Sequence, residues 1–378
     1  MPAVPAPALR SRTRTRRSSA LRTALAAAAT TALVAGCGFT ESDTDRIGRK
    51  AAAGTPETVN AAGAMDDGGA GAGRDTGGGA SGVGSRPPAT PDPTRSPAPE
   101  AQLLRNPARQ VRPAIAPAHG TTVGIGQPVS LVFKGQKVDP ALRAGIEGRV
   151  AVKTSTGVVG AWHWAEAKGD TYLHFRPREY WPAGTEVTLD AKLAGVKLDA
   201  RTAAAGDRKL TFKVGPAMVS KVDLAAHTLT LLQDGTPLRT IPVSGGEERF
   251  RTREGIKTIL SKDGTVLMDS LTIGIPRTSP DGFYGRYEWS MRETVSGEYV
   301  HAAPDNAESF GRANVSHGCI GMSVADAKWL YERSSVGDVI EVTGTTGKPM
   351  DRFGNGYGDW NLSWDEWLRG STLGAFKA

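Results

Sequence analysis

The residues best suited to chemistry lie in one stretch, 314–322, which reads Asn-Val-Ser-His-Gly-Cys-Ile-Gly-Met. Cys319 follows His317 and Gly318 directly, and Gly321 comes two residues later. A thiol is the strongest nucleophile among protein side chains, and a neighbouring base or cation must hold it as thiolate. Flanking glycines allow a tight turn with exposed backbone N–H groups, which can form an oxyanion hole. The stretch therefore predicts nucleophilic catalysis by Cys319.

Two histidines are candidates for the base. His301 lies 18 residues before Cys319, so it could approach the sulfur from a neighbouring strand, which makes it the better candidate. His317 would lie on the same face as Cys319 in an extended backbone, where it could support or position the reacting groups. No carboxylate near His301 stands out to orient its ring, and a backbone carbonyl could do so instead.

Two other interpretations of this stretch stay open. The two histidines and the cysteine could bind zinc, although no further Cys or carboxylate has suitable spacing. The cysteine could also be buried and inert beside a core histidine, although the glycine-flanked loop counts against this.

The overall charge does not indicate a nucleic-acid partner. The 378 residues carry a formal net charge of +7, but six arginines fall within residues 1–36, which contain no Lys, Asp or Glu. Subtracting these six leaves +1 for the remaining chain. A nearly neutral chain lacks the excess positive charge that binds phosphate backbones.

Residues 1–36 have the parts of an export signal peptide: an arginine-rich start, a short apolar run over 24–35, and small residues after it. The run is too short to span a bilayer comfortably. It ends in Leu33-Val34-Ala35-Gly36-Cys37, which resembles a bacterial lipobox, where cleavage before the cysteine exposes it for lipid attachment. We expect an exported protein that is anchored to the cell membrane through lipid on Cys37. An uncleaved anchor or an ordinary signal peptide is the alternative, and the export route, Sec or Tat, stays open.

The cysteine count supports a reactive thiol. An exported chain with two cysteines could form one disulfide. If Cys37 carries lipid, however, Cys319 has no partner, and a free thiol outside the cytosol is a liability unless it is used.

Three further regions follow the signal peptide. Residues 37–110 are rich in Gly, Ala, Pro, Ser and Thr, and such a composition cannot bury a core, so we expect a disordered tether. Residues 111–215 predict short strands separated by Gly, Pro and Asp turns, which is typical of an immunoglobulin-like β-sandwich. The expected strands there are Pro128–Phe133, Arg149–Lys153, Thr171–Arg176, Thr185–Leu193 and Lys209–Val214.

Residues 216–345 predict a second β-rich domain that contains the cysteine loop. Asp234-Gly235 is a strong hairpin signal, and Ser323 to Asp326 predicts a capping box that opens a helix through about Arg333. The expected strands are Met218–Asp223, His227–Gln233, Pro237–Val243, Ile256–Leu260, Val266–Asp269, Tyr287–Arg292, Glu298–His301 and Val339–Val342.

The last region, residues 346–378, contains three tryptophans within eight residues, from Trp360 to Trp367. Ser363 and Glu366 predict a capping box for a short helix. So many indole rings are unfavourable in water, so we expect this segment to pack on the catalytic domain, with a contact surface for the cell wall as the alternative. The fold class expected for the whole chain is mainly β.

These residues resemble a known family. His301-Ala302-Ala303-Pro304 and Ser316-His317-Gly318-Cys319 are similar to the signature of the L,D-transpeptidases, which cross-link peptidoglycan, and the likeness is greatest to the multi-domain actinobacterial members. The resemblance is strong over 216–378 and moderate over 111–215, which corresponds to the family's immunoglobulin-like domain. Further matching segments are Met268-Asp269-Ser270, Ser279-Pro280-Asp281-Gly282, Ala327-Lys328-Trp329, Gly337–Val342 and Gly358-Asp359-Trp360-Asn361.

The resemblance implies a role for each matching residue. Cys319 would attack a tetrapeptide stem at its third residue and expel the terminal D-Ala as a thioester forms. His301, held by the Ala302 carbonyl, would be the base, and backbone N–H groups around His317, Gly318 and Cys319 would bind the oxyanion. An acceptor amine would then attack the thioester and form a 3→3 cross-link. Positions implied to contact the substrate are Met268, Phe283, Tyr284, Ser296, Gly297 and Gly321.

Two of these positions depart from the family pattern. The family usually has Asn where this chain has Gly321, and a substrate-contacting Tyr where it has Phe283, with Tyr284 adjacent. Each lost polar contact would be worth about 1–3 kcal/mol if a buried partner were left unpaired. The resemblance implies a cell-wall enzyme without a cofactor, whose partners are peptidoglycan stem peptides and the membrane. An L,D-carboxypeptidase and a non-catalytic peptidoglycan-binding protein are the alternatives.

Overall fold

A computed structural model describes residues 95–378. The expected signal peptide, the lipidation of Cys37 and most of the expected tether lie outside the described residues. Residues 95–378 fall within one structural unit. The fold is mostly β, as the sequence predicts, with a few short helices.

The N-terminal part of this unit contains two antiparallel-rich sheets. Their strand orders are β3-β10-β8-β5 and β2-β4-β7-β6-β20. A short parallel pair, β1 (Arg109–Val111) with β9 (Thr202–Ala204), and the helix α2 (Arg143–Glu147) complete this part. The strands of the two sheets are β2 Ala114–Ala116, β3 Thr122–Val123, β4 Val129–Phe133, β5 Val150–Thr154, β6 Val159–Ala167, β7 Asp170–Pro177, β8 Glu186–Ala191, β10 Arg208–Val214 and β20 Phe376–Lys377.

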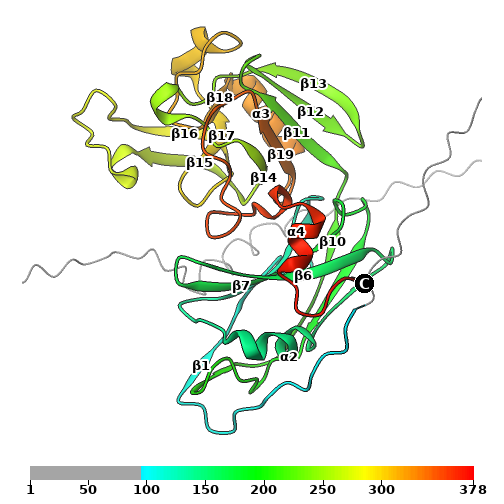
Figure 1. Ribbon diagram of the computed structural model, residues 1–378. Helices are drawn as coiled ribbons and strands as arrows, with labels where there is room; N and C mark the ends of the chain where they lie inside the picture. Colours follow the sequence, from blue (N-terminus) through cyan, green and yellow to red (C-terminus); the bar gives the residue numbers. More distant parts are fainter. Residues whose placement is uncertain (1–94) are drawn as a thin grey trace, which may run out of the picture. The chain divides into compact units, whose positions relative to one another are not determined.

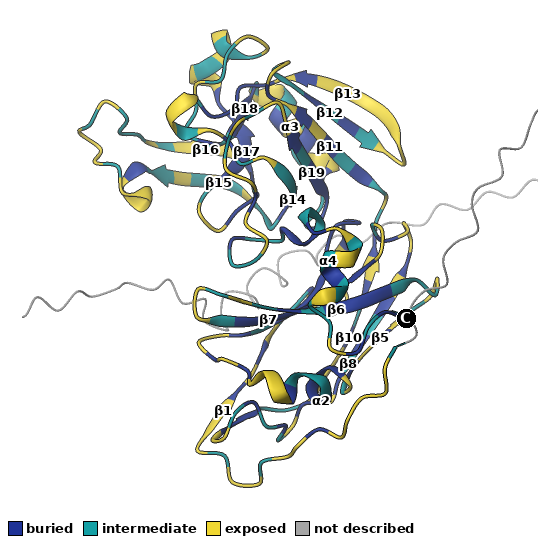
Figure 2. Ribbon diagram, viewed as in Figure 1, coloured by how far each residue is buried: buried dark blue, intermediate teal, exposed yellow. Residues whose placement is uncertain are grey.

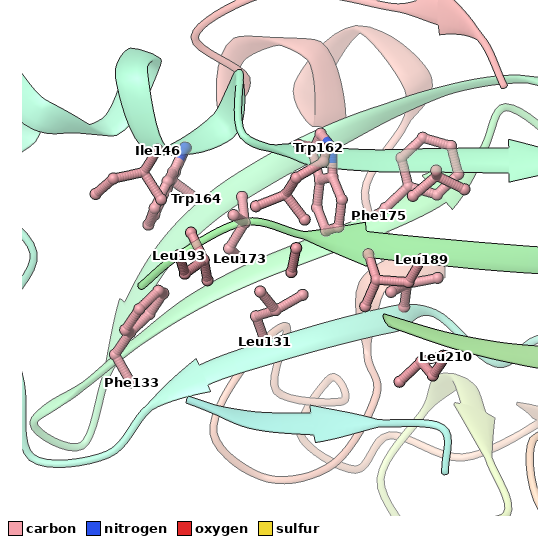
Figure 3. Packing of buried hydrophobic residues seen from close by; sticks show 14 of the residues in the cluster. Leu131, Phe133, Ile146, Trp162, Trp164, Leu173, Phe175, Leu189, Leu193 and Leu210 are labelled. Atoms are coloured by element: carbon pink, nitrogen blue, oxygen red, sulfur yellow. The ribbon is translucent and has the colours of Figure 1, made fainter. Parts of the chain in front are cut away.

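A single apolar core lies between these two sheets (Figure 3). Leu131 from β4 and Leu189 from β8 are both fully buried in it, and Trp162 from β6 packs edge-on against Phe175. All the strands expected here from the sequence are present. The strand β6, which carries the buried Trp162 and Trp164, was not predicted as a strand.

The immunoglobulin-like domain begins earlier in the chain than the sequence predicts. Ala101 is buried in the core, and the Leu104 N–H donates to the Gly195 carbonyl (2.9 Å). The Ser96 N–H likewise donates to the Leu373 carbonyl (2.7 Å). Residues 96–110 therefore pack on the immunoglobulin-like domain, because their backbone pairs with segments that are remote in sequence.

Two further sheets form the C-terminal part, in the orders β13-β12-β11-β19-β14 and β15-β16-β17-β18. The expected hairpin is present, since Asp234 and Gly235 both have positive φ (50° and 80°) between β12 and β13. At the edge of its sheet, β13 is exposed along most of its length (Figure 2). The strands are β11 Met218–Asp223, β12 Thr228–Gln233, β13 Thr236–Pro242, β14 Gly255–Thr258, β15 Ser261–Asp269, β16 Tyr284–Arg292, β17 Tyr299–Ala302, β18 Ile320–Met322 and β19 Val339–Thr343.

The helix after the cysteine loop, α3 (Val324–Arg333), begins at Ser323, whose hydroxyl accepts from the Asp326 N–H. The Asp326 carboxylate bonds the Ser323 hydroxyl rather than its backbone, so the cap differs from the expected capping box. The helix packs against β16 and β17 (Figure 1), and it buries Ala327 and Leu330. It thereby supports the strands that carry the candidate site.

The C-terminal segment packs on the catalytic domain, as expected, through Asn361 and the backbone of Ile256, but it also packs on the immunoglobulin-like domain, which was not expected. The helix α4 (Trp364–Arg369) has the expected capping box, and its Trp367 Nε1 donates to the Ala161 carbonyl in β6 (3.0 Å). The reason for this docking is Arg176 on β7, whose buried guanidinium lies over three indole rings. Its distances to the ring centres are 4.7 Å for Trp360, 5.6 Å for Trp364 and 4.6 Å for Trp367.

A buried polar chain adds to this docking. His174 on β7 lies between the Ser130 hydroxyl, 2.8 Å from Nε2, and the Asp359 carboxylate, 2.7 Å from Nδ1. The immunoglobulin-like domain also contacts the catalytic domain closely at Gly124, where an added Cβ would lie 2.2 Å from the Asp338 nitrogen. Only glycine fits such an approach.

Candidate active site

Two neighbouring strands bring His301 and Cys319 together. The pairing of β17 with β18 is parallel, with Val300 opposite Ile320 and His301 opposite Gly321. Cys319 directly precedes β18, and alternate residues of a strand share a face. His301 and Cys319 are therefore presented on the same face of this strand pair, although they lie 18 residues apart in sequence.

The imidazole of His301 has a defined tautomer. Its Nδ1 lies 2.7 Å from the Ala302 carbonyl oxygen, which can only accept, so Nδ1 carries the proton and Nε2 is left with a lone pair. The Tyr287 ring packs edge-on against the imidazole, with ring centres 4.8 Å apart. Burial lowers the pKa of His301 to about 4, which the Ala302 hydrogen bond only partly offsets. His301 is thus neutral at pH 7 and able to accept a proton.

Cys319 is a free thiol among the described residues. Its Sγ lies 3.7 Å from the Gly297 carbonyl, which accepts from the S–H group. Burial raises the pKa of Cys319 to about 12; Glu293 and Glu298 add to this rise, while the Tyr299 N–H and Lys257 oppose it. A neutral thiol beside a neutral imidazole is suited to a reaction in which the proton leaves the sulfur as the sulfur attacks.

The loop before the thiol has a specific geometry. The His317 ring lies between Phe250 and Phe283, at 4.4 and 4.9 Å between ring centres, and its buried Nε2 has no hydrogen-bond partner within residues 95–378. Gly318 has a φ of +116°, which favours glycine. Its N–H donates to the Ser316 hydroxyl (3.1 Å), so this N–H, which the resemblance assigns to the oxyanion hole, is already engaged.

The expected substrate contacts on β15, on β16 and directly before β16 are exposed to different degrees. Met268 is half-buried and pairs with Gly285. Phe283 contacts His317, as described above. Tyr284 is 57% exposed, and the Arg277 guanidinium lies 4.1 Å from its ring centre. Of these three, only Phe283 is seen to touch the cysteine loop.

Ser296 and Gly297 lie in the turn between β16 and β17. The Gly297 carbonyl contacts the thiol, and Ser296 is held by a residue of the C-terminal segment that the sequence had not singled out. The Asn355 Oδ1 accepts from the Ser296 N–H (2.8 Å), and its Nδ2 donates to the Ser296 hydroxyl (3.0 Å). Asn355 is 1% exposed, so the segment that docks on the immunoglobulin-like domain also positions this turn.

Gly321 has no room for a side chain. A Cβ added there would lie 2.9 Å from the Ala303 Cβ and 3.8 Å from a Phe310 ring carbon. The asparagine side chain that the family usually has at this position would therefore not fit here, because Ala303 occupies the space next to Gly321.

A buried charge cluster near the thiol, formed by Lys257, Glu293 and Glu298, was not predicted from the sequence. The available signal was a single charged residue, Lys257, within a predicted strand and a glutamate at each end of a turn. In residues 95–378, no three His, Cys, Asp or Glu side chains are grouped to hold a metal ion. No helix of that part of the chain is long and apolar enough to cross a membrane.

The fold and this site define a two-domain protein with a cysteine–histidine centre, and comparison with known proteins agrees. Residues 103–197 match a bacterial Ig domain, and residues 218–342 match the L,D-transpeptidase catalytic domain. L,D-transpeptidase 1 of Mycobacterium tuberculosis is 36% identical over 233 residues, covering 61% of this chain and 84% of that protein. The chain belongs to the L,D-transpeptidase family.

A second relative and a solved structure show the same similarity. L,D-transpeptidase 2 of Mycobacterium tuberculosis is 31% identical over 267 residues, or 71% of this chain, and the chain spans 64% of the length of that relative. Among solved structures, the LD transpeptidase LdtMt1 in complex with imipenem is 35% identical, covers 62% of this chain and 99% of its own, and superposes with a TM-score of 0.52.

Proposed function

We propose that the protein is a peptidoglycan L,D-transpeptidase that forms 3→3 cross-links through a thioester on Cys319. The observation that carries the proposal is the pairing of β17 with β18, which presents a neutral imidazole and a neutral thiol on one face. The family membership supports the reaction class.

The first half-reaction would form the acyl-enzyme. His301 Nε2 takes the thiol proton as Sγ attacks the carbonyl carbon of the third stem residue. The tetrahedral intermediate collapses when the bond to D-Ala breaks, and the imidazolium returns the proton to the leaving amine. Burial of His301 favours this return, because it disfavours the charged imidazolium.

The second half-reaction would consume the thioester. An amine of a neighbouring stem attacks the same carbonyl carbon, His301 accepts a proton from that amine, and the thiolate leaves and is reprotonated. If water replaces the amine, the product is a tripeptide. The acyl-enzyme is common to both outcomes, so the identity of the acceptor decides between transfer and hydrolysis.

A stem-peptide assay tests the proposal. Incubation of the purified protein with a disaccharide-tetrapeptide should yield a cross-linked dimer by mass. Tripeptide alone would indicate an L,D-carboxypeptidase, and no product would favour a binding protein. Imipenem, which is bound in the LdtMt1 structure, offers a second probe. Its adduct should form on wild type and be absent from Cys319→Ala; an adduct on that variant would place the nucleophile elsewhere.

We also propose that the protein works outside the cell, anchored to the membrane through Cys37. The sequence of residues 33–37 and the absence of a disulfide partner for Cys319 within residues 95–378 support this. Mass spectrometry of the mature protein should find lipid on Cys37, and a Cys37–Cys319 disulfide would contradict the proposal.

A further inference from the structure

One buried lysine holds both ends of the turn that contacts the thiol. The turn runs from Glu293 to Glu298, and the Glu293 N–H donates to the Glu298 carbonyl (2.9 Å). The Lys257 Nζ on β14 lies 3.2 Å from Glu293 Oε2 and 3.1 Å from Glu298 Oε2. The side chains of Lys257 and Glu293 are fully buried, and that of Glu298 is 8% exposed.

Such a cluster is an unfavourable way to fill a core. Removing three ionisable groups from water is costly, and apolar residues of the same volume are often as stable or more so. The cluster is also imperfectly paired, since Glu293 Oε1 has no hydrogen-bond partner among residues 95–378 and burial raises the pKa of Glu293. Its placement next to the thiol therefore indicates a role beyond stability.

Glu298 lies next to both of the loops that flank the thiol. It ends the turn that carries Gly297, whose carbonyl lies 3.7 Å from the Cys319 Sγ. A Cβ added to Gly318, in the loop on the other side, would lie 3.5 Å from Glu298 Oε1. The same oxygen accepts from the Arg253 guanidinium (2.9 Å) and from the Arg253 N–H (3.2 Å).

We propose that Glu298 is a positioning residue for acylation of Cys319, held in place by Lys257 and Arg253 so that Gly297 and Gly318 keep their places on either side of the sulfur. The inference rests on Cys319 being the nucleophile, as proposed above. Glu293 completes the clamp on Lys257, but it contacts neither Arg253 nor the cysteine loop.

The first test compares two matched amide variants of the full chain. Glu298→Gln keeps the shape of the side chain but removes its charge, and it should slow acylation by imipenem at least tenfold at pH 7. Glu293→Gln should stay within about threefold of wild type, because it leaves the contacts to Arg253 and Gly318 intact. Glu332→Gln, an exposed partner of Lys328 on α3, serves as the control that leaves the rate unchanged.

The second test measures how the charges of Glu298 and Lys257 affect formation of the Cys319 thiolate. A purely structural role would not shift this titration in opposite directions. The pH dependence of Cys319 alkylation by iodoacetamide reports formation of the thiolate. The Glu298 carboxylate disfavours the thiolate and Lys257 favours it, so Glu298→Gln should move the profile to lower pH and Lys257→Met to higher pH. If Lys257→Met does not fold, Glu293→Gln takes its place and should move the profile to lower pH without slowing acylation.

The outcomes separate this inference from the proposed function. If wild type forms no imipenem adduct on Cys319, the proposed function fails. If wild type reacts but Glu298→Gln reacts equally fast, or if Glu298→Gln and Lys257→Met move the profile in the same direction, only the positioning role of Glu298 is overturned. Slow acylation by Glu298→Gln beside a nearly normal rate for Glu293→Gln supports it, together with opposite profile shifts for Glu298→Gln and Lys257→Met where the lysine variant folds.

Discussion

A methyl group at Gly321 should disturb the candidate site directly. Gly321 is buried in β18 opposite His301, and its added Cβ would lie 2.9 Å from the Ala303 Cβ. Carbon atoms are most favourably separated by about 3.5–4.0 Å. The Ala303 Cβ is bonded to the backbone and cannot rotate away, so β17 and β18 must move apart. β17 carries His301, and β18 begins directly after Cys319.

Two effects of opposite sign decide the stability of Gly321→Ala. Loss of freedom in the unfolded chain favours alanine by about 0.4–1 kcal/mol. Overpacking of a well-packed core costs about 1–3 kcal/mol. The contact is rigid on both sides, so we expect the second effect to prevail and the variant to be destabilised by about 1–2 kcal/mol. A misplacement of about 1 Å near a reacting centre can slow a reaction about a hundredfold, so we also expect acylation to fall at least tenfold.

Denaturant unfolding and imipenem acylation measure the two effects. Ala303→Gly in the same chain should restore part of both losses, and a double-mutant cycle should show favourable coupling between the two positions. Gly215→Ala is the matched control, because its Cβ would meet no atom nearer than 3.5 Å. The reasoning is refuted if Gly321→Ala is as stable and as fast as wild type, or if Ala303→Gly rescues nothing.

Three further predictions concern titration and burial. Because burial lowers the pKa of His301 to about 4, and only the neutral ring accepts a proton, acylation should increase as pH rises through about 4; an increase confined to alkaline pH would place the base elsewhere. Burial raises the pKa of Asp338 from its ordinary 3.8 to about 7, so the unfolded chain releases this proton first as pH rises. Asp338 should therefore contribute up to about 4 kcal/mol of stability at pH 4 that is lost by pH 8, so the difference in unfolding free energy between wild type and Asp338→Asn should change by that amount in urea titrations over this range. Asp359→Ala leaves His174 Nδ1 without its partner and should cost about 1–3 kcal/mol in the same assay, whereas the exposed Asp365→Ala should change stability by less than about 0.5 kcal/mol.

Much of the local structure follows from neighbouring residues. The Asp234-Gly235 hairpin was predictable because both residues tolerate positive φ, and Ser363 with Glu366 capped α4 as expected. The strand β6 was harder to recognise, because Gly160, Ala161 and Trp162 are buried in succession, which interrupts the alternation of polar and apolar residues that marks a half-exposed strand. The three-residue β18 is too short to carry a pattern at all.

Long-range packing explains why contact between the C-terminal segment and the immunoglobulin-like domain was not predicted. The tryptophans of 360–367 predict a buried segment, but not its partner. That partner is Arg176, which lies nearly two hundred residues earlier and is itself buried against the rings. Asn355, which holds Ser296, was missed for the same reason: its hydrogen bonds cross from one end of the chain to a turn of the catalytic domain.

The sequence by itself determined which side chains can react, since a glycine-flanked Cys319 and a remote His301 are chemically distinctive wherever the chain places them. It also determined most of the strands, because hydrophobic pattern and turn chemistry are local properties. Only the tertiary structure decided the charge state of the pair, the cluster of Lys257 with Glu298, and the absence of space at Gly321. Burial, electrostatic partners and available volume are set by segments far apart in the chain, and no stretch of sequence contains them.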